Sequence, residues 1–209
     1  TLTVEHADSA LKRIDRVAPT ATVTTSNNGE FTNKDVTVTI FTNEAIRKPA
    51  GWTSIETTKK EHEFSKVYTA NGNYEVEITD KAGNKSIIPF TVTGIDRKAP
   101  KFAPEKWSYT LEADKDAKFV CPDMSQYVTD EYSGVKSVVV DKWFTENWSI
   151  PDQTKPGKFT CRYISTDNAG NSVSNDIFYT VVDTIAPKVT NVTGRQVSEG
   201  EATKKQTIT

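Results

Sequence analysis

Long apolar runs, histidine and methionine are scarce in this chain of 209 residues, and the scarcity narrows what the protein can be. No window approaches the roughly 18 consecutive apolar residues that a membrane-spanning helix needs. The 26 lysines and arginines nearly balance the 28 aspartates and glutamates. A net charge of −2 provides no field suited to nucleic acid or to an anionic membrane. We therefore expect neither nucleic acid nor a membrane among the partners.

The residue constellations of common enzymes are also missing. The two histidines are His6 and His62, and the stretch HEFSK that begins at His62 lacks the second histidine that a zinc protease helix needs. No Gly-Xaa-Ser-Xaa-Gly elbow and no phosphate-binding glycine loop occurs. Neighbouring carboxylates such as Asp130 and Glu131 are ordinary solvated charges unless a cleft holds them. We expect no catalysis by this segment and no cofactor.

What the chain does contain is short stretches in which apolar and polar residues alternate. VTVTI at 36–40 puts its three aliphatic residues on one side, and YEVEI at 74–78 puts Glu75 and Glu77 on the side opposite its apolar residues. Further strands are predicted over 90–92, 117–121, 135–140, 158–163 and 176–182. No stretch shows sustained helical periodicity. The pattern predicts an all-β protein built from immunoglobulin-like antiparallel sandwiches.

One turn-like phrase is written twice in the chain. TDKAGN stands at 79–84 and TDNAGN at 166–171, so that Asp80 and Asp167 are 87 residues apart. That spacing is the size of a small domain rather than of a short helical repeat. The recurrence therefore predicts two copies of one fold.

A second phrase recurs at a fixed distance from the first. It reads apolar, Asp, two variable residues, Ala, Pro, and its aspartate follows Asp80 and Asp167 by 16 residues each time. Its three occurrences are marked by Asp15 and Pro19, by Asp96 and Pro100, and by Asp183 and Pro187. Two phrases locked at one offset indicate tandem repeats.

The phrases set the expected domain boundaries and junctions. We expect the tail of an upstream repeat over 1–15, complete domains over 16–96 and 97–183, and the start of a truncated third repeat over 184–209. The linker before Pro100 is short and contains no Gly/Ser tract, and proline restricts it further. The two domains are therefore expected to lie end to end.

The repeated turn has a structural explanation and a functional alternative. Gly83 can adopt the positive φ of a tight reversal, Asn84 tolerates it, and Asp80 can accept hydrogen bonds from the following backbone N–H groups. The same roles are expected of Asp167, Gly170 and Asn171. The alternative is a calcium site, but calcium requires about six to eight oxygen ligands, so the structural explanation is preferred.

The linker between the two expected domains also allows either a structural role or a calcium site. Asp96 is expected to cap backbone donors there, while Arg97 or Trp107 contacts the neighbouring domain. The alternative is that Asp96 helps to hold a calcium ion between the domains. A single linker carboxylate is few for such a site, so we expect a junction that needs no calcium.

Several of these phrases together resemble a known family. NGNYEVEITDKAGN followed by GIDRKAP, with KPAGW upstream, is similar to the immunoglobulin-like repeats of large surface and secreted proteins of Gram-positive bacteria. VTDEYSGVKSV before GKFTCRYISTDNAGN is similar to a sister type related to hyalin repeats and bacterial immunoglobulin-like (Big) modules. The resemblance spans 17–183. It implies an extracellular, non-catalytic spacer or adhesion module, in some proteins behind the catalytic domain of a secreted hydrolase.

The two cysteines fall in the second expected domain. Cys121 shares the parity of Phe119, and Cys161 shares that of Phe159 and Tyr163, so both are expected to point into one core. In immunoglobulin domains the corresponding strands face each other and are joined by a disulfide. A Cys121–Cys161 bridge would suit an oxidising compartment. The alternative is a pair of buried thiols.

An aromatic cluster also allows two explanations. Trp143, Phe144 and Trp148 lie in DKWFTENWSI, where they could stack on sugar rings if exposed. Tryptophan is mostly buried in small domains, so we favour packing for this cluster and for Trp52.

Two functions follow as hypotheses. The favoured one is an extracellular bacterial spacer or stalk, expected to be a monomer whose partners are neighbouring domains of the same chain. The alternative is a cell-adhesion or accessory module that binds a glycan or a host protein. The two differ in whether a contiguous binding patch is exposed.

Overall fold

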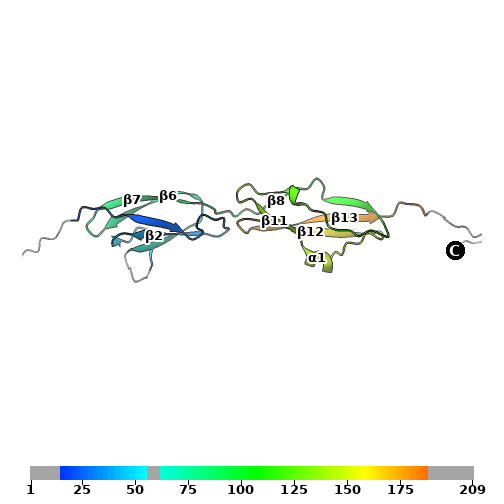
Figure 1. Cartoon of the computed structure of the whole chain (residues 1–209), viewed down its shortest axis with the longest axis horizontal. Helices are drawn as coiled ribbons and strands as arrows, with labels where there is room; N and C mark the ends of the chain where they lie inside the picture. Colours follow the sequence, from blue (N-terminus) through cyan, green and yellow to red (C-terminus); the bar gives the residue numbers. More distant parts are fainter. Residues whose placement is uncertain (1–14, 56–61, 188–209) are drawn as a thin grey trace, which may run out of the picture.

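The structure is a computed structural model, and it describes residues 15–55 and 62–187. It consists mostly of short strands in four sheets, together with one helix of six residues, α1 (Lys142–Asn147), and one 3-10 turn, η1 (Ser125–Tyr127). The predicted β class is therefore confirmed. Figure 1 shows the strands in two groups that follow one another along the long axis of the molecule. In the described part of the chain, no helix has the length and apolar character to cross a membrane.

The first strand group contains two sheets. One has the order β1-β2-β5-β4 and the other β3-β6-β7, and all neighbouring strands are antiparallel. The strands are β1 (Ala21–Thr25), β2 (Val36–Thr42), β3 (Ile46–Arg47), β4 (Thr53–Ser54), β5 (Glu63–Tyr68), β6 (Gly72–Asp80) and β7 (Lys85–Val92).

The core of the first group follows from the alternation in its strands. Val36, Val38 and Ile40 of β2 are fully buried, and Val76 and Ile78 of β6 are buried with them. Glu75 and Glu77 between the buried positions of β6 are exposed, as the alternation predicts. Trp52 joins this core as expected, with its ring edge-on to Phe90 at a centroid distance of 6.1 Å.

The second strand group has a four-stranded sheet of order β11-β12-β13-β9 and a two-stranded sheet of β10 and β8. β9 runs parallel to β13, whereas the other pairs are antiparallel. The strands are β8 (Lys101–Phe102), β9 (Ser108–Glu112), β10 (Val128–Thr129), β11 (Val135–Val140), β12 (Gly157–Asp167) and β13 (Ser172–Val182). Its core is rich in aromatic side chains, including Phe159, Tyr163 and Tyr179.

The predicted strand over 117–121 is wrong. This segment has an irregular backbone and pairs with no other strand of the described chain, and the neighbouring Pro122 has no N–H to give to a sheet. Phe119 and Cys121 nevertheless pack against the second core. The side chains of this segment therefore pack against the core although its backbone is not paired in a sheet.

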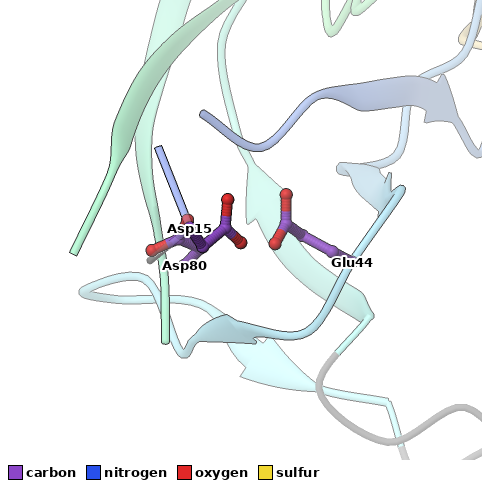
Figure 2. Close-up of side chains that lie close together, drawn as sticks. All are labelled: Asp15, Glu44 and Asp80. Carbon is purple, nitrogen blue, oxygen red and sulfur yellow. The ribbon is translucent and has the colours of Figure 1, made fainter. Parts of the chain in front are cut away.

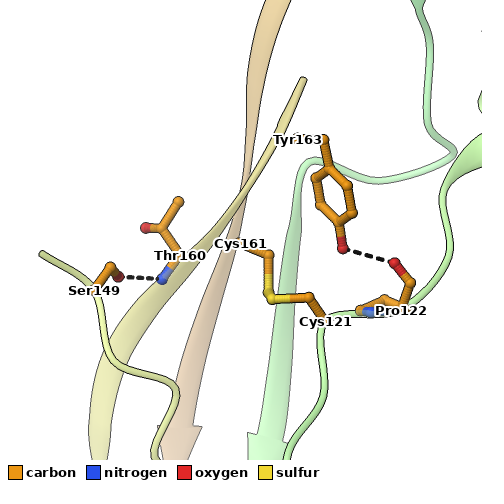
Figure 3. Close-up of a disulfide and its surroundings, with 6 residues drawn as sticks. All are labelled: Cys121, Pro122, Ser149, Thr160, Cys161 and Tyr163. Carbon is orange, nitrogen blue, oxygen red and sulfur yellow. Dashed lines mark hydrogen bonds between the residues drawn. A yellow bond between two sulfur atoms is a disulfide. The ribbon is translucent and has the colours of Figure 1, made fainter. Parts of the chain in front are cut away.

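The predicted disulfide is present. Cys121 is bonded to Cys161 of β12, with the two Cα atoms 5.8 Å apart (Figure 3). Beside the bond, the Tyr163 hydroxyl donates a hydrogen bond of 2.8 Å to the carbonyl of Pro122. Burial raises the pKa of Tyr163 far above its usual value, so this donor keeps its proton at any physiological pH. The irregular segment is thus fixed to β12 at two adjacent points.

Removal of the disulfide should destabilise the second strand group. The Cys121→Ser/Cys161→Ser variant opens a loop with a sequence separation of 40 residues, for which the chain-entropy model gives a loss of about 4 kcal/mol. Urea unfolding, followed by backbone amide signals of each group, measures this loss. The first group contains neither cysteine and should unfold at an unchanged midpoint. An equal shift in both groups, or two free thiols in the denatured, unreduced protein, would contradict the assignment.

Candidate functional site

The turn at 79–84 is built around a buried carboxylate. Asp80 is only 1% exposed. Its Oδ1 accepts hydrogen bonds from the backbone N–H groups of Gly83 at 2.5 Å and Asn84 at 2.8 Å. Its Oδ2 accepts a further bond of 2.7 Å from the side-chain amide of Asn84. The carboxylate therefore takes the place of water as the hydrogen-bond acceptor for the N–H groups of the turn.

The turn at 166–171 repeats this arrangement. Asp167, which is fully buried, accepts bonds of 2.8 Å from the backbone N–H and from the side-chain amide of Asn171. Gly83 and Gly170 have φ values of +102° and +93°, a region that glycine enters without the cost that a Cβ imposes. Both turns therefore place glycine at positive φ and bind the closing asparagine to the aspartate, although the Gly170 N–H donates to the backbone carbonyl of Asp167 at 3.3 Å and not to its carboxylate.

The asparagine that ends each turn has a second role that the sequence did not reveal. Its side-chain amide reaches two carbonyls of the preceding linker, so that it joins linker, turn and buried aspartate. Asn84 donates to the carbonyls of Asp15 at 3.3 Å and Val17 at 3.2 Å, and Asn171 to those of Asp96 at 3.0 Å and Lys98 at 3.1 Å. The only signal in the sequence was the fixed place of this asparagine in both phrases.

The linker aspartates form local turns of their own. In each of the three linkers, Oδ1 of the aspartate accepts the N–H of the residue two positions later. The pairs are Val17 to Asp15 at 3.0 Å, Lys98 to Asp96 at 2.9 Å, and Ile185 to Asp183 at 3.3 Å. The prolines that follow in the first two linkers, Pro19 and Pro100, are buried, whereas Pro187 is exposed.

These elements bring carboxylates together at two places. Asp15, Glu44 and Asp80 form one acidic triad, in which one oxygen from each side chain lies within 4.8 Å of the others (Figure 2). Asp96, Asp130 and Asp167 form a second triad with the same limit on distance. Each triad combines a linker aspartate, a turn aspartate and a third carboxylate. Sequence reasoning did not anticipate Glu44 or Asp130 in this role, because no repeated phrase contains them.

The donor chemistry of the triads fits a calcium ion. Carboxylate oxygens are the ligands that calcium prefers, and backbone carbonyls of the linkers lie next to both triads. The sequence indicated only one aspartate at each candidate calcium site, whereas the fold brings three carboxylates together at each of them. The groups that would hold the ion are the carboxylates of Asp96, Asp130 and Asp167 between the strand groups, and those of Asp15, Glu44 and Asp80 at the other end of the first group.

Hydrogen bonds already keep two of these carboxylates ionised. Burial by itself would raise the pKa of Asp80, but the hydrogen bonds from Asn84 and Gly83 outweigh it and hold the pKa below its usual value. Burial likewise opposes ionisation of Asp96, and hydrogen bonds from Ser133 and Lys98 lower its pKa. Protein donors therefore stabilise the negative charge at both ends of the first strand group.

A tyrosine from the second strand group holds the junction. The Tyr132 hydroxyl accepts hydrogen bonds from the Asn71 side-chain amide at 3.0 Å and from the Gly94 N–H at 3.3 Å. The Tyr132 ring lies edge-on to Phe31 with the centroids 5.6 Å apart. Asp130 positions this tyrosine, because its Oδ1 accepts the N–H groups of the loop that begins at Tyr132. The second triad and the tyrosine contact thus share one loop.

The linker itself adds two further contacts across the junction. Arg97 forms an ion pair with Asp35 and a hydrogen bond of 3.4 Å to the carbonyl of Asn33. The N–H of Asn33 in turn donates to the carbonyl of Ala169 in the second group at 3.1 Å. Trp107 does not take the place expected for it, since its ring packs against Phe102 within the second group. Polar contacts therefore join the two groups.

The aromatic cluster is exposed, contrary to the packing that its composition favoured. Trp143 is 64% and Trp148 is 70% exposed, and their rings lie side by side with centroids 6.1 Å apart. They protrude because Trp143 lies on α1 and Trp148 follows its last residue, and α1 lies against β12 and projects from the body in Figure 1. Burial statistics for tryptophan could not reveal this, since a short helix outside a sheet has no opposite layer to cover it.

Several side-chain contacts hold the base of this aromatic surface. Phe144 lies under the guanidinium of Arg162, at 3.7 Å from Cζ to the ring centroid. Arg162 is held by two hydrogen bonds to Asp176 of β13, at 2.7 and 2.9 Å. Asp141 caps the start of α1 by accepting the N–H of Phe144 at 3.1 Å. Trp143 and Trp148 therefore stand on a fixed support.

Comparison of the chain with protein-family models and with curated proteins found no match.

Acid should weaken the fold through the turn aspartate Asp80 and the linker aspartate Asp96. The folded pKa values of Asp80 and Asp96 lie below the ordinary value of 3.8, so their stabilisation is complete above that value and is lost as the pH falls below it. We expect these groups to leave the thermal unfolding midpoint unchanged between about pH 5 and 7. At pH values below about 4 the midpoint temperature should decrease.

Two variants isolate the carboxylate in this experiment. Asp80→Asn cannot titrate, so it should lower the midpoint at pH 7 but reduce the further loss between pH 6 and 3. Asp116→Asn removes an exposed carboxylate that pairs with the adjacent Lys115 and should leave the pH profile unchanged. An Asp80→Asn profile as steep as that of the parent chain would show that acid acts elsewhere.

Proposed function

We propose that this chain is a non-catalytic segment of an extracellular array of immunoglobulin-like domains, in which it acts as a spacer or stalk. The two strand groups are the two domains, 16–96 and 97–183, placed end to end. The Cys121–Cys161 disulfide supports an oxidising, extracellular compartment. The neighbouring domains of the same chain are the principal partners, and the chain is a monomer in this proposal.

The observation that carries the proposal is the repetition of one hydrogen-bonded linker device. In both strand groups an asparagine at the end of the turn phrase binds two linker carbonyls and the buried turn aspartate. Repetition of a side-chain network, and not only of a strand pattern, supports descent of both groups from one domain type. Because each domain binds the linker that leads into it, the linker keeps one conformation, and this suits an array of domains that must stay extended.

The junction contacts support stiffness. Between β7, which ends at Val92, and β8, which begins at Lys101, the linker is bonded by Asn171, Asn71 and Tyr132. A linker with this many bonded groups has little of the freedom of a flexible coil. The second domain should therefore follow the first in a preferred direction.

A second function is favoured by one observation, the exposure of Trp143 and Trp148. Two adjacent indoles, with ring planes inclined at 55° to each other, offer apolar surface to a sugar ring, and exposed aromatic surface of this kind marks interaction sites. In this alternative the chain is a carbohydrate-binding or host-protein-binding module of an adhesin or a secreted hydrolase.

Small-angle scattering tests the spacer. We expect an elongated particle whose maximum dimension is the same in calcium and in chelator, because the contacts of Tyr132 and Arg97 require no cation. Tyr132→Ala should broaden the distance distribution, since it removes the hydroxyl bonds and the Phe31 contact together.

Tyr132→Phe keeps the ring contact and should show an intermediate effect, while Phe178→Ala, at an exposed site away from the junction, should show none. A compact parent chain would overturn the spacer. Bending caused by chelator alone would instead show that the triad of Asp96, Asp130 and Asp167 holds calcium at the joint.

Retention on neutral insoluble polysaccharides separates the two functions. A spacer predicts no retention of the parent chain on cellulose or chitin. Retention that is lost in Trp143→Ala/Trp148→Ala but kept in Trp107→Ala, which removes an exposed tryptophan elsewhere, would favour the binding module.

A further inference from the structure

A groove in the first strand group lies where the chain crosses from one sheet to the other. β3 ends at Arg47 in the sheet of β6, and β4 begins at Thr53 in the sheet of β5. The crossing contains a tight turn in which the Trp52 N–H donates to the Pro49 carbonyl at 3.2 Å, and Gly51 has a φ of +76°. The buried Trp52 anchors this turn in the core. The groove beside it has a volume of about 450 Å³.

The groove is lined by more positive than negative side chains. Four basic residues and two glutamates line it, and one basic residue, Lys85, is paired with Glu77 at 2.8 Å. Within the described ranges, the remaining cations, Arg47, Lys48 and Lys66, take part in no ion pair. The groove therefore presents uncompensated positive charge, although the whole chain has a net charge of −2.

Lys66 is the unusual member of this set. It shares the inward side of β5 with Phe64 and Tyr68, which are both buried. Its ammonium lies 5.5 Å from the centre of the Tyr68 ring and 3.6 Å from the position that a Cβ on Gly51 would occupy. The aliphatic part of the Lys66 side chain thus lies between the sheets, while its ammonium group reaches the groove. Lysine is rarely found on the inward side of a strand, so this position is unusual.

We propose that this groove binds an acidic sugar residue, that is, a sugar unit bearing a carboxylate. The guanidinium of Arg47 and the ammonium groups of Lys48 and Lys66 bind the acid group, because a planar guanidinium matches a carboxylate and an ammonium adds charge. Glu75, which is exposed and also lines the groove, accepts hydrogen bonds from ring hydroxyls. The volume falls within the range of about 300 to 1,000 Å³ that is usual for small-ligand sites.

Two other anionic occupants fit the groove less well. An acidic peptide would be repelled by Glu75, and the strands that flank the groove, β3 and β4, have two residues each, too few to pair with an added strand. Inorganic phosphate satisfies the cations but leaves Glu75 without a partner. Among the described residues, three cations and one carboxylate of the groove take part in no ion pair, a mixture that suits a ligand with one acid group and several hydroxyls.

The inference is independent of the spacer function and of the Trp143 and Trp148 pair. Its test is a titration of the ¹⁵N-labelled chain with D-glucuronate, with D-glucose, inorganic phosphate and tetraglutamate as comparison probes. We expect saturable shifts with glucuronate, centred on the amides of Gly51 and Thr79 and on the Trp52 indole, and weaker binding at high salt.

Matched variants locate the binding. Lys66→Met keeps the apolar stem and should weaken glucuronate binding at least about tenfold, the loss expected for one charge-assisted hydrogen bond. Arg47→Gln should weaken it in the same direction, whereas Lys158→Met, at an exposed site of the second group, should not. The spectrum of each variant reports directly whether it is folded.

Three outcomes would overturn the proposal. Equal affinity for glucose would show that the acid group is not recognised, and tighter binding of phosphate or tetraglutamate would assign another anion. Absence of saturable shifts with every probe would leave Lys66 with a purely structural role, in which an inward lysine prevents other strands from pairing with the end of β5.

Discussion

A buried carboxylate that accepts several N–H groups is the interaction on which both strand groups depend. Asp80 and Asp167 each end a long core strand, where the chain must reverse and where its N–H groups would otherwise lose water without gaining a partner. The carboxylate supplies that partner, and the following asparagine extends the network to the linker. The fold of each group and the direction of its incoming chain are thus fixed by the same few atoms.

The junction continues this network. Asp96 binds the linker between the strand groups through the N–H of Lys98, and it binds the second group through the N–H of Ser133 at 3.2 Å. Because Asp130 orders the loop that carries Tyr132, the acidic triad and the tyrosine contact are mechanically one unit. The loop that carries Tyr132 therefore connects the acidic triad to the contact between the groups.

Sequence reasoning succeeded where local rules decide the outcome. The alternation in β2 and β6, the positive φ of Gly83 and Gly170 and the disulfide all follow from residue chemistry and parity. It failed at 117–121, because alternation predicts which side chains are buried but not whether a second strand is present to pair with the backbone. It failed again at Trp143 and Trp148, because burial statistics describe an average tryptophan and not a helix outside the sheets.

The sequence by itself determined the β class, the repeated turns and the short linkers, since alternation, glycine, aspartate and proline act within a few residues of themselves. Only the tertiary structure decided which distant groups meet. Asp130 joins Asp96 and Asp167, Tyr132 reaches Asn71, and Lys66 comes to lie beside Gly51, because strand pairing and linker direction close distances that no local pattern encodes. These long-range encounters place charge at the junction and in the groove, and they therefore carry the functional proposals.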